Sequence, residues 1–208
     1  MMLHSLSEWL GRPVIAGDEP LGTVEDAVLD VLNWRLRYLV VDLNGRPALL
    51  IPGALSLPAG EQPLQLSVSR EQIAGSPPLP ETGLTDDYEA ALANHYGWEL
   101  EQIELETNID EDGAQATDHL LRFEEIRGHT LRAADGRAGR LDDFVVGDEN
   151  WALFYMVVGS TGLFEADRQV LLPPTWVEMI AEGEIAVELN KETIHKSRPY
   201  QPENLNDD

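Results

Sequence analysis

Two stretches of strand-forming residues organise the hydrophobic pattern of this chain. Residues 34–42 read Trp-Arg-Leu-Arg-Tyr-Leu-Val-Val-Asp, and residues 151–159 read Trp-Ala-Leu-Phe-Tyr-Met-Val-Val-Gly. β-branched and aromatic residues dominate both, and such residues favour a pleated, packed surface over a helix. Because apolar residues occupy both alternating faces, each stretch predicts a strand buried inside a small barrel. Tyr38 and Tyr155, in the middle of these strands, are therefore expected to be largely buried.

The two stretches are parts of an internal repeat. Trp34 and Trp151 lie 117 residues apart, and the same spacing relates Tyr38 to Tyr155 and Val41 to Val158. Beyond these strands the spacing becomes 121, which gives the second copy a loop four residues longer. The repeat predicts two small β-barrels that superpose on each other. The fold class is therefore mainly β, with four expected segments: a first barrel at 1–80, a connection at 81–121, a second barrel at 122–202 and a tail at 203–208.

Several short signals support the same pattern in both copies. Gly22 and Gly139 occupy matching strand positions, where a bulge or a close approach of two backbones is the usual reason for glycine. A short helical turn around Leu6 and Trp9 is expected to cover one end of a barrel. Each copy closes in a further helical turn, which begins after Ser69 in the first copy and after Asn190 in the second.

One segment of the connection shows the spacing of an amphipathic helix. Thr85 is a candidate N-cap, acidic residues follow it in the first turn, and Gly97 ends the pattern. The predicted helix covers residues 84–97 and packs on the first barrel or between the barrels. Its predicted apolar stripe consists of Tyr88, Ala91, Leu92, His95 and Tyr96.

Charge and composition exclude several classes of function. The net charge is −24, and such a field repels nucleic-acid backbones and anionic lipid surfaces. Residues 81–121 contain 12 acidic residues and no Lys or Arg, so half of the net charge lies in this connection, and residues 106–119 are expected to form an irregular acidic tether. There is no cysteine, which excludes disulfides and thiolate chemistry. No apolar run is long enough to span a bilayer, and no segment has the pattern of a signal peptide. A cytoplasmic protein without a transmembrane segment is therefore expected.

The repeated pattern resembles the PRC-barrel family. The resemblance rests on the Gly-bounded copies, each with a Trp-x-x-x-Tyr-Leu/Met-Val-Val strand followed by Leu-Ile/Leu-Pro, and on the helix that ends in Tyr96-Gly97-Trp98. The family includes the cytoplasmic domain of the photosynthetic reaction-centre H subunit and the C-terminal domain of a 16S ribosome-maturation factor. The chain is most similar to tandem PRC-barrel proteins of bacteria. The resemblance covers residues 3–98 and 122–202, and implies adaptor or assembly modules rather than a catalytic activity.

Motifs for catalysis or for cofactors are weak. The five histidines lack metal-binding spacing, and acidic pairs such as Asp142-Asp143 and Glu124-Glu125 are interpreted as solvated faces. Asn108, Asp110, Asp112 and Gly113 match the first half of a calcium loop, but His119 stands where the closing Glu is required. An acidic tether is therefore the preferred interpretation. We predict neither an enzyme nor a resident cofactor.

The preferred functional hypothesis is a non-catalytic scaffold or adaptor that binds a protein partner or self-associates. The alternative is a protein that responds to a small molecule or a metal bound in the cleft between the barrels. The longer loop of the second copy carries Leu163 and Phe164 among turn and charged residues. This apolar pair either folds over the mouth of the barrel or forms the centre of a partner-binding surface.

Overall fold

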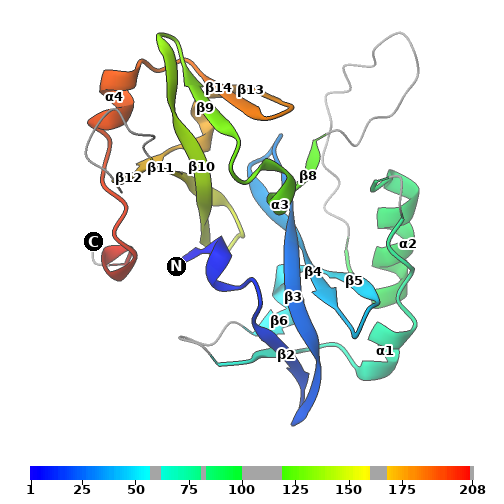
Figure 1. Cartoon of the computed structure of the whole chain (residues 1–208). Coiled ribbons are helices and arrows are strands. Elements are labelled where there is room, and N and C mark those ends of the chain that lie inside the picture. Colours follow the sequence, from blue (N-terminus) through cyan, green and yellow to red (C-terminus); the bar gives the residue numbers. More distant parts are fainter. Residues whose placement is uncertain (57–61, 81–82, 100–118, 160–167, 207–208) are drawn as a thin grey trace, which may run out of the picture. The chain divides into compact units, whose positions relative to one another are not determined.

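The computed structural model describes residues 1–56, 62–80, 83–99, 119–159 and 168–206 (Figure 1). The described chain is mainly β and forms two seven-stranded sheets. The N-terminal sheet has the order β5-β4-β3-β2-β7-β6, with β8 paired to β3, and the C-terminal sheet has the order β12-β11-β10-β9-β14-β13, with β1 paired to β10. Leaving β1 and β8 aside, the two sheets have the same strand order. The structure thus confirms the predicted mainly β fold built from two similar sheets.

The N-terminal sheet takes six strands from residues 13–66 and its seventh, β8, from beyond α2. They are β2 (Pro13–Ala16), β3 (Glu19–Asp30), β4 (Arg35–Asp42), β5 (Pro47–Leu50), β6 (Leu55–Ser56), β7 (Leu64–Leu66) and β8 (Leu120–Arg122). Proline ends β5 as expected, since Pro52 begins a 3-10 turn, η2 (Pro52–Ala54). The first copy closes in α1 (Arg70–Ala74), where Ser69 and Gln72 form the predicted capping box.

The C-terminal sheet repeats this arrangement. Its strands are β1 (Leu3–Ser5), β9 (Thr130–Ala133), β10 (Gly136–Gly147), β11 (Leu153–Gly159), β12 (Gln169–Leu172), β13 (Val177–Ala181) and β14 (Glu184–Val187). Its helical turns are η1 (Leu6–Glu8), α3 (Phe123–Ile126), η3 (Pro174–Trp176), α4 (Lys191–His195) and η4 (Pro202–Asn204). Asn190 caps α4 as predicted, because its side chain accepts a hydrogen bond from the Thr193 N–H.

The chain divides into two compact units whose boundaries differ from the ranges that the repeat predicts. One unit contains Met1–Leu10, Asp26–Arg37 and Leu121–Asp208, and the other contains Gly11–Glu25 and Tyr38–Leu120. We call them the C-terminal unit and the N-terminal unit. The long strands β3 and β4 run through both units. The N-terminal segment of the chain therefore belongs to the C-terminal unit, because β1 pairs with β10.

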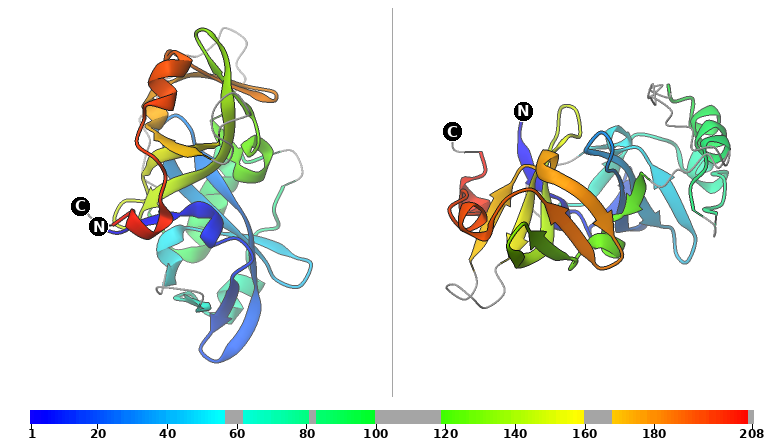
Figure 2. Two further views of the ribbon diagram at one scale, coloured as in Figure 1. Left: turned by 60° about the vertical axis from the view of Figure 1, so that its left-hand side comes forward. Right: turned by 90° about the horizontal axis from the view of Figure 1, so that it is seen from above.

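The short helical turn at the N-terminus is confirmed, but its packing partner was not expected. Leu6 and Trp9 are fully buried, as a plug would be. Strand β1 runs antiparallel to β10, with Leu3 opposite Gly147 and Ser5 opposite Val145. Figures 1 and 2 show this first segment, in dark blue, beside the yellow-green β10. The hydrophobic pattern predicted a buried turn, but pattern alone does not specify which of two similar sheets accepts it.

The predicted helix is confirmed as α2 (Asp86–Tyr96), with Thr85 as N-cap and Gly97 in the left-handed conformation at the C-terminus. Its predicted stripe is wrong at three positions, because it includes Ala91 and omits Glu89 and Ala93. Ala91 is exposed, whereas Glu89 is buried together with Leu92, Ala93 and Tyr96. The reason is a hydrogen bond, since the Tyr38 hydroxyl donates to the Glu89 carboxylate at 2.6 Å. A buried carboxylate needs such a donor. Helix α2 thus covers β4 within the N-terminal unit.

In the C-terminal sheet, different residues pack over β11, the strand that is equivalent to β4. Tyr38 is fully buried, whereas Tyr155 is partly buried, so the central tyrosine is more exposed in this copy than in the first. Tyr155 packs instead against a cluster made of Val145, Val157, Leu171 and Leu205, with Leu3 and Tyr200 at its margin. The C-terminal segment, red in Figure 2, also pairs with β12, because the Leu171 N–H donates to the Arg198 carbonyl and the Tyr200 N–H to the Gln169 carbonyl.

Both glycines at the matching strand positions are required by close backbone approaches, as predicted. A Cβ atom at Gly22 would overlap the carbonyl oxygen of Asp42. A Cβ atom at Gly139 would lie 2.5 Å from the carbonyl oxygen of Gly159. The two contacts are equivalent, because the same spacing of 117 residues relates Gly22 to Gly139 and Asp42 to Gly159. This crossing of strands allows the long β3 and β10 to bend.

Candidate functional site

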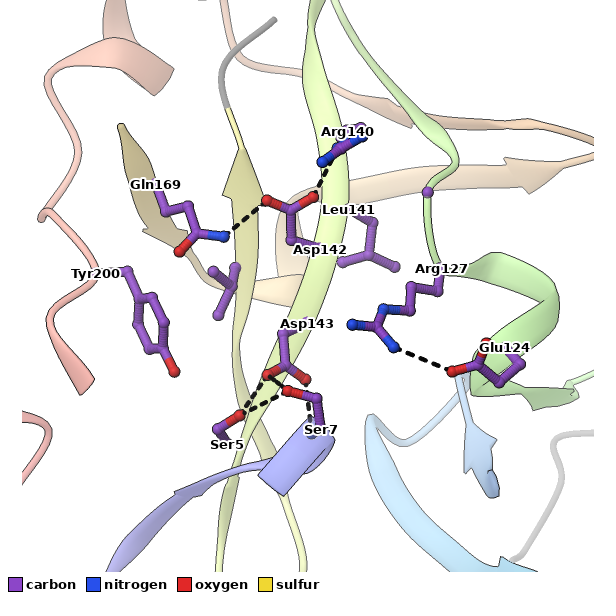
Figure 3. Close-up of a pocket in the computed structure, with 12 residues that line it drawn as sticks. Ser5, Ser7, Glu124, Arg127, Arg140, Leu141, Asp142, Asp143, Gln169 and Tyr200 are labelled. Carbon is purple, nitrogen blue, oxygen red and sulfur yellow. Dashed lines mark hydrogen bonds and ion pairs between the residues drawn. The ribbon is translucent and has the colours of Figure 1, made fainter. Parts of the chain in front are cut away.

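A polar pocket of about 510 Å³ lies in the C-terminal unit, between β10 and the N-terminal segment (Figure 3). Two acidic residues of β10 face it, at a shift of register in the pairing of β10 with β11 between Leu141 and Asp143. Asp143 is only 6% exposed. The interpretation of Asp142-Asp143 as a solvated pair is therefore wrong for Asp143. The bulge accounts for this, because it shifts the alternation of side chains along the strand.

Asp143 holds the N-terminal segment in place. Its carboxylate accepts hydrogen bonds from the Ser7 hydroxyl at 2.6 Å, from the Ser7 N–H at 3.1 Å and from the Ser5 hydroxyl. The N–H of Phe144 donates a further bond at 2.8 Å. A buried carboxylate with four donors is well compensated for the loss of hydration. The chemical role visible here is to anchor β1 and η1 on β10, rather than to transfer a proton.

Asp26 of β3 has the same role at the matching position of the first copy. It is 2% exposed, and its carboxylate accepts hydrogen bonds from Arg122 Nε at 2.6 Å, from the Glu124 N–H at 3.1 Å and from the Ala27 N–H at 2.7 Å. Arg122 ends β8, and Glu124 lies in α3. Asp26 and Asp143 therefore each bind a segment that consists of a short strand and a helical turn.

The rest of the pocket is lined by side chains that already bind one another. Arg140 Nε donates to Asp142 at 2.8 Å, Gln169 Nε2 donates to the same carboxylate at 2.7 Å, and Arg127 contacts Glu124 at 3.2 Å. Tyr200 lies at the margin, where burial raises the pKa of its hydroxyl above the usual value. The pocket thus combines both signs of charge with one phenol.

A second contact joins the start of the N-terminal segment to the turn between β10 and β11. The N–H of Met2 donates to Asp148 Oδ1 at 2.7 Å, and the Asp148 N–H donates to the Met2 carbonyl at 3.0 Å. The hydrogen bond from Met2 lowers the pKa of Asp148 below the usual value of an aspartate, and nearby His4 contributes in the same direction. The imidazole Nε2 of His4 lies 3.7 Å from the Asp148 carboxylate.

The residues that the sequence singled out do not lie in this pocket. The calcium-loop candidates Asn108, Asp110 and Asp112 and the apolar pair Leu163 and Phe164 are outside the described residues. Within the described ranges, no group of three or more His, Asp or Glu side chains could hold a metal ion. The sequence analysis missed the burial of Asp26 and Asp143. Their signal was an acidic residue at equivalent positions of the repeat, directly before an apolar run in each strand.

One further structural finding concerns membranes. Among the residues that the structure describes, no helix is both long enough and apolar enough to cross a lipid bilayer.

Comparison with known proteins gives one family match, within the first copy. No curated protein matches the chain. The PRC-barrel domain family matches residues 1–68, the range that contains β1 to β7. The match does not extend to the second copy, which resembles the first in the strand order of its sheet. The comparison therefore finds a PRC-barrel domain match at residues 1–68 of this chain.

Proposed function

We propose that this protein is a non-catalytic, cytoplasmic scaffold or adaptor that binds a protein partner or a second copy of itself through surfaces of its PRC-type sheets. The PRC-barrel match supports this proposal, because the family resemblance implies an interaction module. Fold alone does not name a ligand, so the argument depends on a site.

The observation that carries the proposal is the binding of residues 1–10 to β10. This segment behaves as a peptide ligand of the C-terminal sheet. It adds a strand through backbone pairing, inserts Leu6 and Trp9 as fully buried anchors, and hydrogen-bonds to the buried Asp143 through two serine hydroxyls. Strand addition with apolar anchors is a common mode of peptide recognition. These sheets are therefore suited to binding extended protein segments.

Charge and exposed apolar side chains favour a basic protein as the external partner. A chain of net charge −24 attracts cationic surfaces and repels acidic ones. In the C-terminal unit, Trp176 at the end of η3 is 37% exposed, and Met179 within β13 is 55% exposed. Aromatic and methionine side chains of this kind commonly form the centre of an interface. We include Leu163 and Phe164 in the proposed partner-binding surface.

Affinity capture with three variants tests the proposal. Tagged full-length protein is used to capture partners from the native cell, and each partner is then purified and its affinity measured. We expect Leu163→Ser with Phe164→Ser, or Met179→Ser, to weaken binding of the partner about tenfold or more while the melting temperature stays nearly unchanged. The control Met2→Ser changes another exposed apolar residue and should bind normally. Unchanged binding in both variants, or loss of stability with binding intact, would contradict the proposed surface.

A second candidate function is supported by the pocket of Figure 3. Its volume and its mixture of Arg127, Arg140, Gln169 and Tyr200 side chains suit a small polar molecule. A ligand screen by thermal shift tests this alternative. It predicts a ligand that raises the melting temperature of the full chain and loses this effect in Arg140→Ala.

A further inference from the structure

Several contacts within the C-terminal unit occur in reciprocal pairs. In each pair, a contact between a residue of the first copy and a residue of the second is repeated in the opposite direction by the residues 117 positions away. The Leu36 N–H donates to the Trp151 carbonyl at 2.8 Å, and the Leu153 N–H donates to the Trp34 carbonyl at 2.7 Å. All four residues belong to the C-terminal unit.

The strand pairings obey the same rule. Strand β1 of the first copy pairs with β10 of the second, and β8 at the start of the second copy pairs with β3 of the first. Leu3 and Leu120, at the beginning of β1 and β8, are equivalent by position, as are the long strands β3 and β10. Each copy has therefore given its first strand to the other copy. We call β1 and β8 the exchanged strands.

The buried aspartates extend the rule to side chains. Asp143 accepts hydrogen bonds from Ser5 and Ser7, and Asp26 accepts hydrogen bonds from Arg122 and from the backbone of Glu124. Ser5 is equivalent to Arg122, and Ser7 to Glu124. The backbone donors are the same, because the Ser7 N–H donates to Asp143 and the Glu124 N–H donates to Asp26. The side-chain donors differ, since Ser5 offers a hydroxyl and Arg122 a guanidinium. The two copies therefore share the arrangement of the segment on the buried aspartate rather than every bond.

Reciprocal contacts of this kind are characteristic of a twofold, isologous interface. In such an interface residue i of one subunit contacts residue j of the other, and j contacts i in return. A contact between two unrelated surfaces of one chain has no reason to repeat with a constant displacement. The face concerned consists of the exchanged strands, the inner part of β3 and β10, and the turns at Trp34 and Trp151.

We propose that this face is a dimerisation surface for PRC-type repeats. In this chain the two repeats bind each other through it, so that the chain is a covalently linked pseudo-dimer. The partner that the face recognises is a second PRC-type repeat with its own exchangeable first strand. The inference deepens the proposed function by naming one surface and its partner class, and the test below needs no external partner. Because both copies of the face are occupied within the chain, an external partner must bind elsewhere.

Cutting the connection between the copies tests this inference. A protease site is placed between residues 106 and 112, the full chain is purified intact, and it is then cut. We expect the two pieces to remain together as one species with the mass of the intact chain at micromolar concentration. Cutting in moderate urea, followed by removal of the urea, provides the same sample if the native chain resists the protease. Separation of the pieces into two folded species would overturn the inference.

Substitutions identify the face that holds the pieces together. Asp26→Ala combined with Asp143→Ala should raise the dissociation constant of the cut pieces at least tenfold. The matched control is Asp142→Ala, because Asp142 lies beside Asp143 but binds Arg140 and Gln169 of its own copy. An equal effect of the control would contradict the assignment.

If the cut pieces precipitate, hydrogen exchange in the uncut chain tests the same inference. The amides of Leu36 and Leu153 should be protected to a similar degree, since each donates to a carbonyl of the other copy. Exchange of both amides at the rate of an unstructured peptide would overturn the inference. A failure here leaves the capture of an external partner unaffected, so the two proposals fail separately.

Discussion

Trp34 and Trp151 both have a left-handed backbone conformation, with φ of 50° and 59°, and each accepts a hydrogen bond from the residue two positions beyond the other. Positive φ is uncommon for a bulky residue. Its occurrence at equivalent positions shows that the turn before each central strand is held by the same pair of contacts. The Trp34 ring also lies 6.5 Å from the Phe144 ring, and the Trp151 ring lies 6.2 Å from the Trp9 ring.

This backbone conformation predicts an unusual order of stabilities at position 34. Trp34→Asn and Trp34→Ile both lose the ring contact with Phe144, but only asparagine tolerates positive φ well. We expect Trp34→Ile to be less stable than Trp34→Asn by about 1 kcal/mol or more. Chemical denaturation of the two variants measures the difference. Equal stability of the two would show that the turn relaxes to an ordinary conformation.

The close approach at Gly22 predicts a large effect of a single methyl group. In Gly22→Ala the new Cβ atom would overlap the Asp42 carbonyl oxygen, so one strand must move. We expect the free energy of unfolding to fall by about 3 kcal/mol, within the range of severe backbone and packing mutations. Gly53→Ala is the control, since nothing lies within 4 Å of a Cβ atom there and its φ is not positive. If both variants unfold at the same denaturant concentration, the strands do not cross at Gly22.

The hydrogen bond from Tyr38 to Glu89 predicts coupling between α2 and β4. Tyr38→Phe removes a donor from a buried carboxylate, and we expect a loss of about 1.5 to 3 kcal/mol in the free energy of unfolding. In Glu89→Leu the carboxylate is absent, so the further change Tyr38→Phe should cost much less. A double-mutant cycle by urea denaturation measures this coupling. Additive effects would mean that the two side chains do not interact.

The lowered pKa of Asp148 predicts release of the N-terminal segment in acid. The ordinary pKa of aspartate is about 3.9, and a folded-state pKa below that value stabilises the docked segment at higher pH. This contribution is lost as the pH falls through the lowered pKa. We expect hydrogen exchange of residues 1–5 to accelerate more steeply below about pH 4 in the native chain than in Asp148→Asn. The same pH profile in both proteins would show that Asp148 does not control the release.

The local structure was predictable because it depends on short-range signals. The strand pattern around Tyr38, the cap at Thr85 and the capping box at Ser69 all have the predicted form. The comparison of the two copies also predicted that glycine is required at positions 22 and 139, and the close backbone approaches there confirm it. Such features depend on backbone preferences and on the alternation of side chains, which one sequence contains.

The candidate site depended on long-range choices that the pattern leaves open. Two similar sheets offer the first strand two equivalent positions, and the hydrophobic alternation of residues 3–9 fits both. The burial of Asp143 follows from that choice, because Ser5 and Ser7 compensate its charge only when β1 lies on β10. The burial of Glu89 was not predicted for a similar reason, since its partner Tyr38 lies 51 residues away in the sequence.

Disulfide mapping tests the exchange of the first strands most directly. The chain has no cysteine, so a pair of introduced cysteines forms a single defined bond. His4 lies opposite Val146 on β10, and the distance between paired residues of antiparallel strands suits a disulfide. Leu29 is equivalent to Val146 in the first copy. We predict that oxidation of His4→Cys with Val146→Cys gives an intrachain disulfide in nearly all molecules, whereas His4→Cys with Leu29→Cys gives little. Efficient bonding of the second pair, or disulfides that join two chains, would contradict an exchange within the chain.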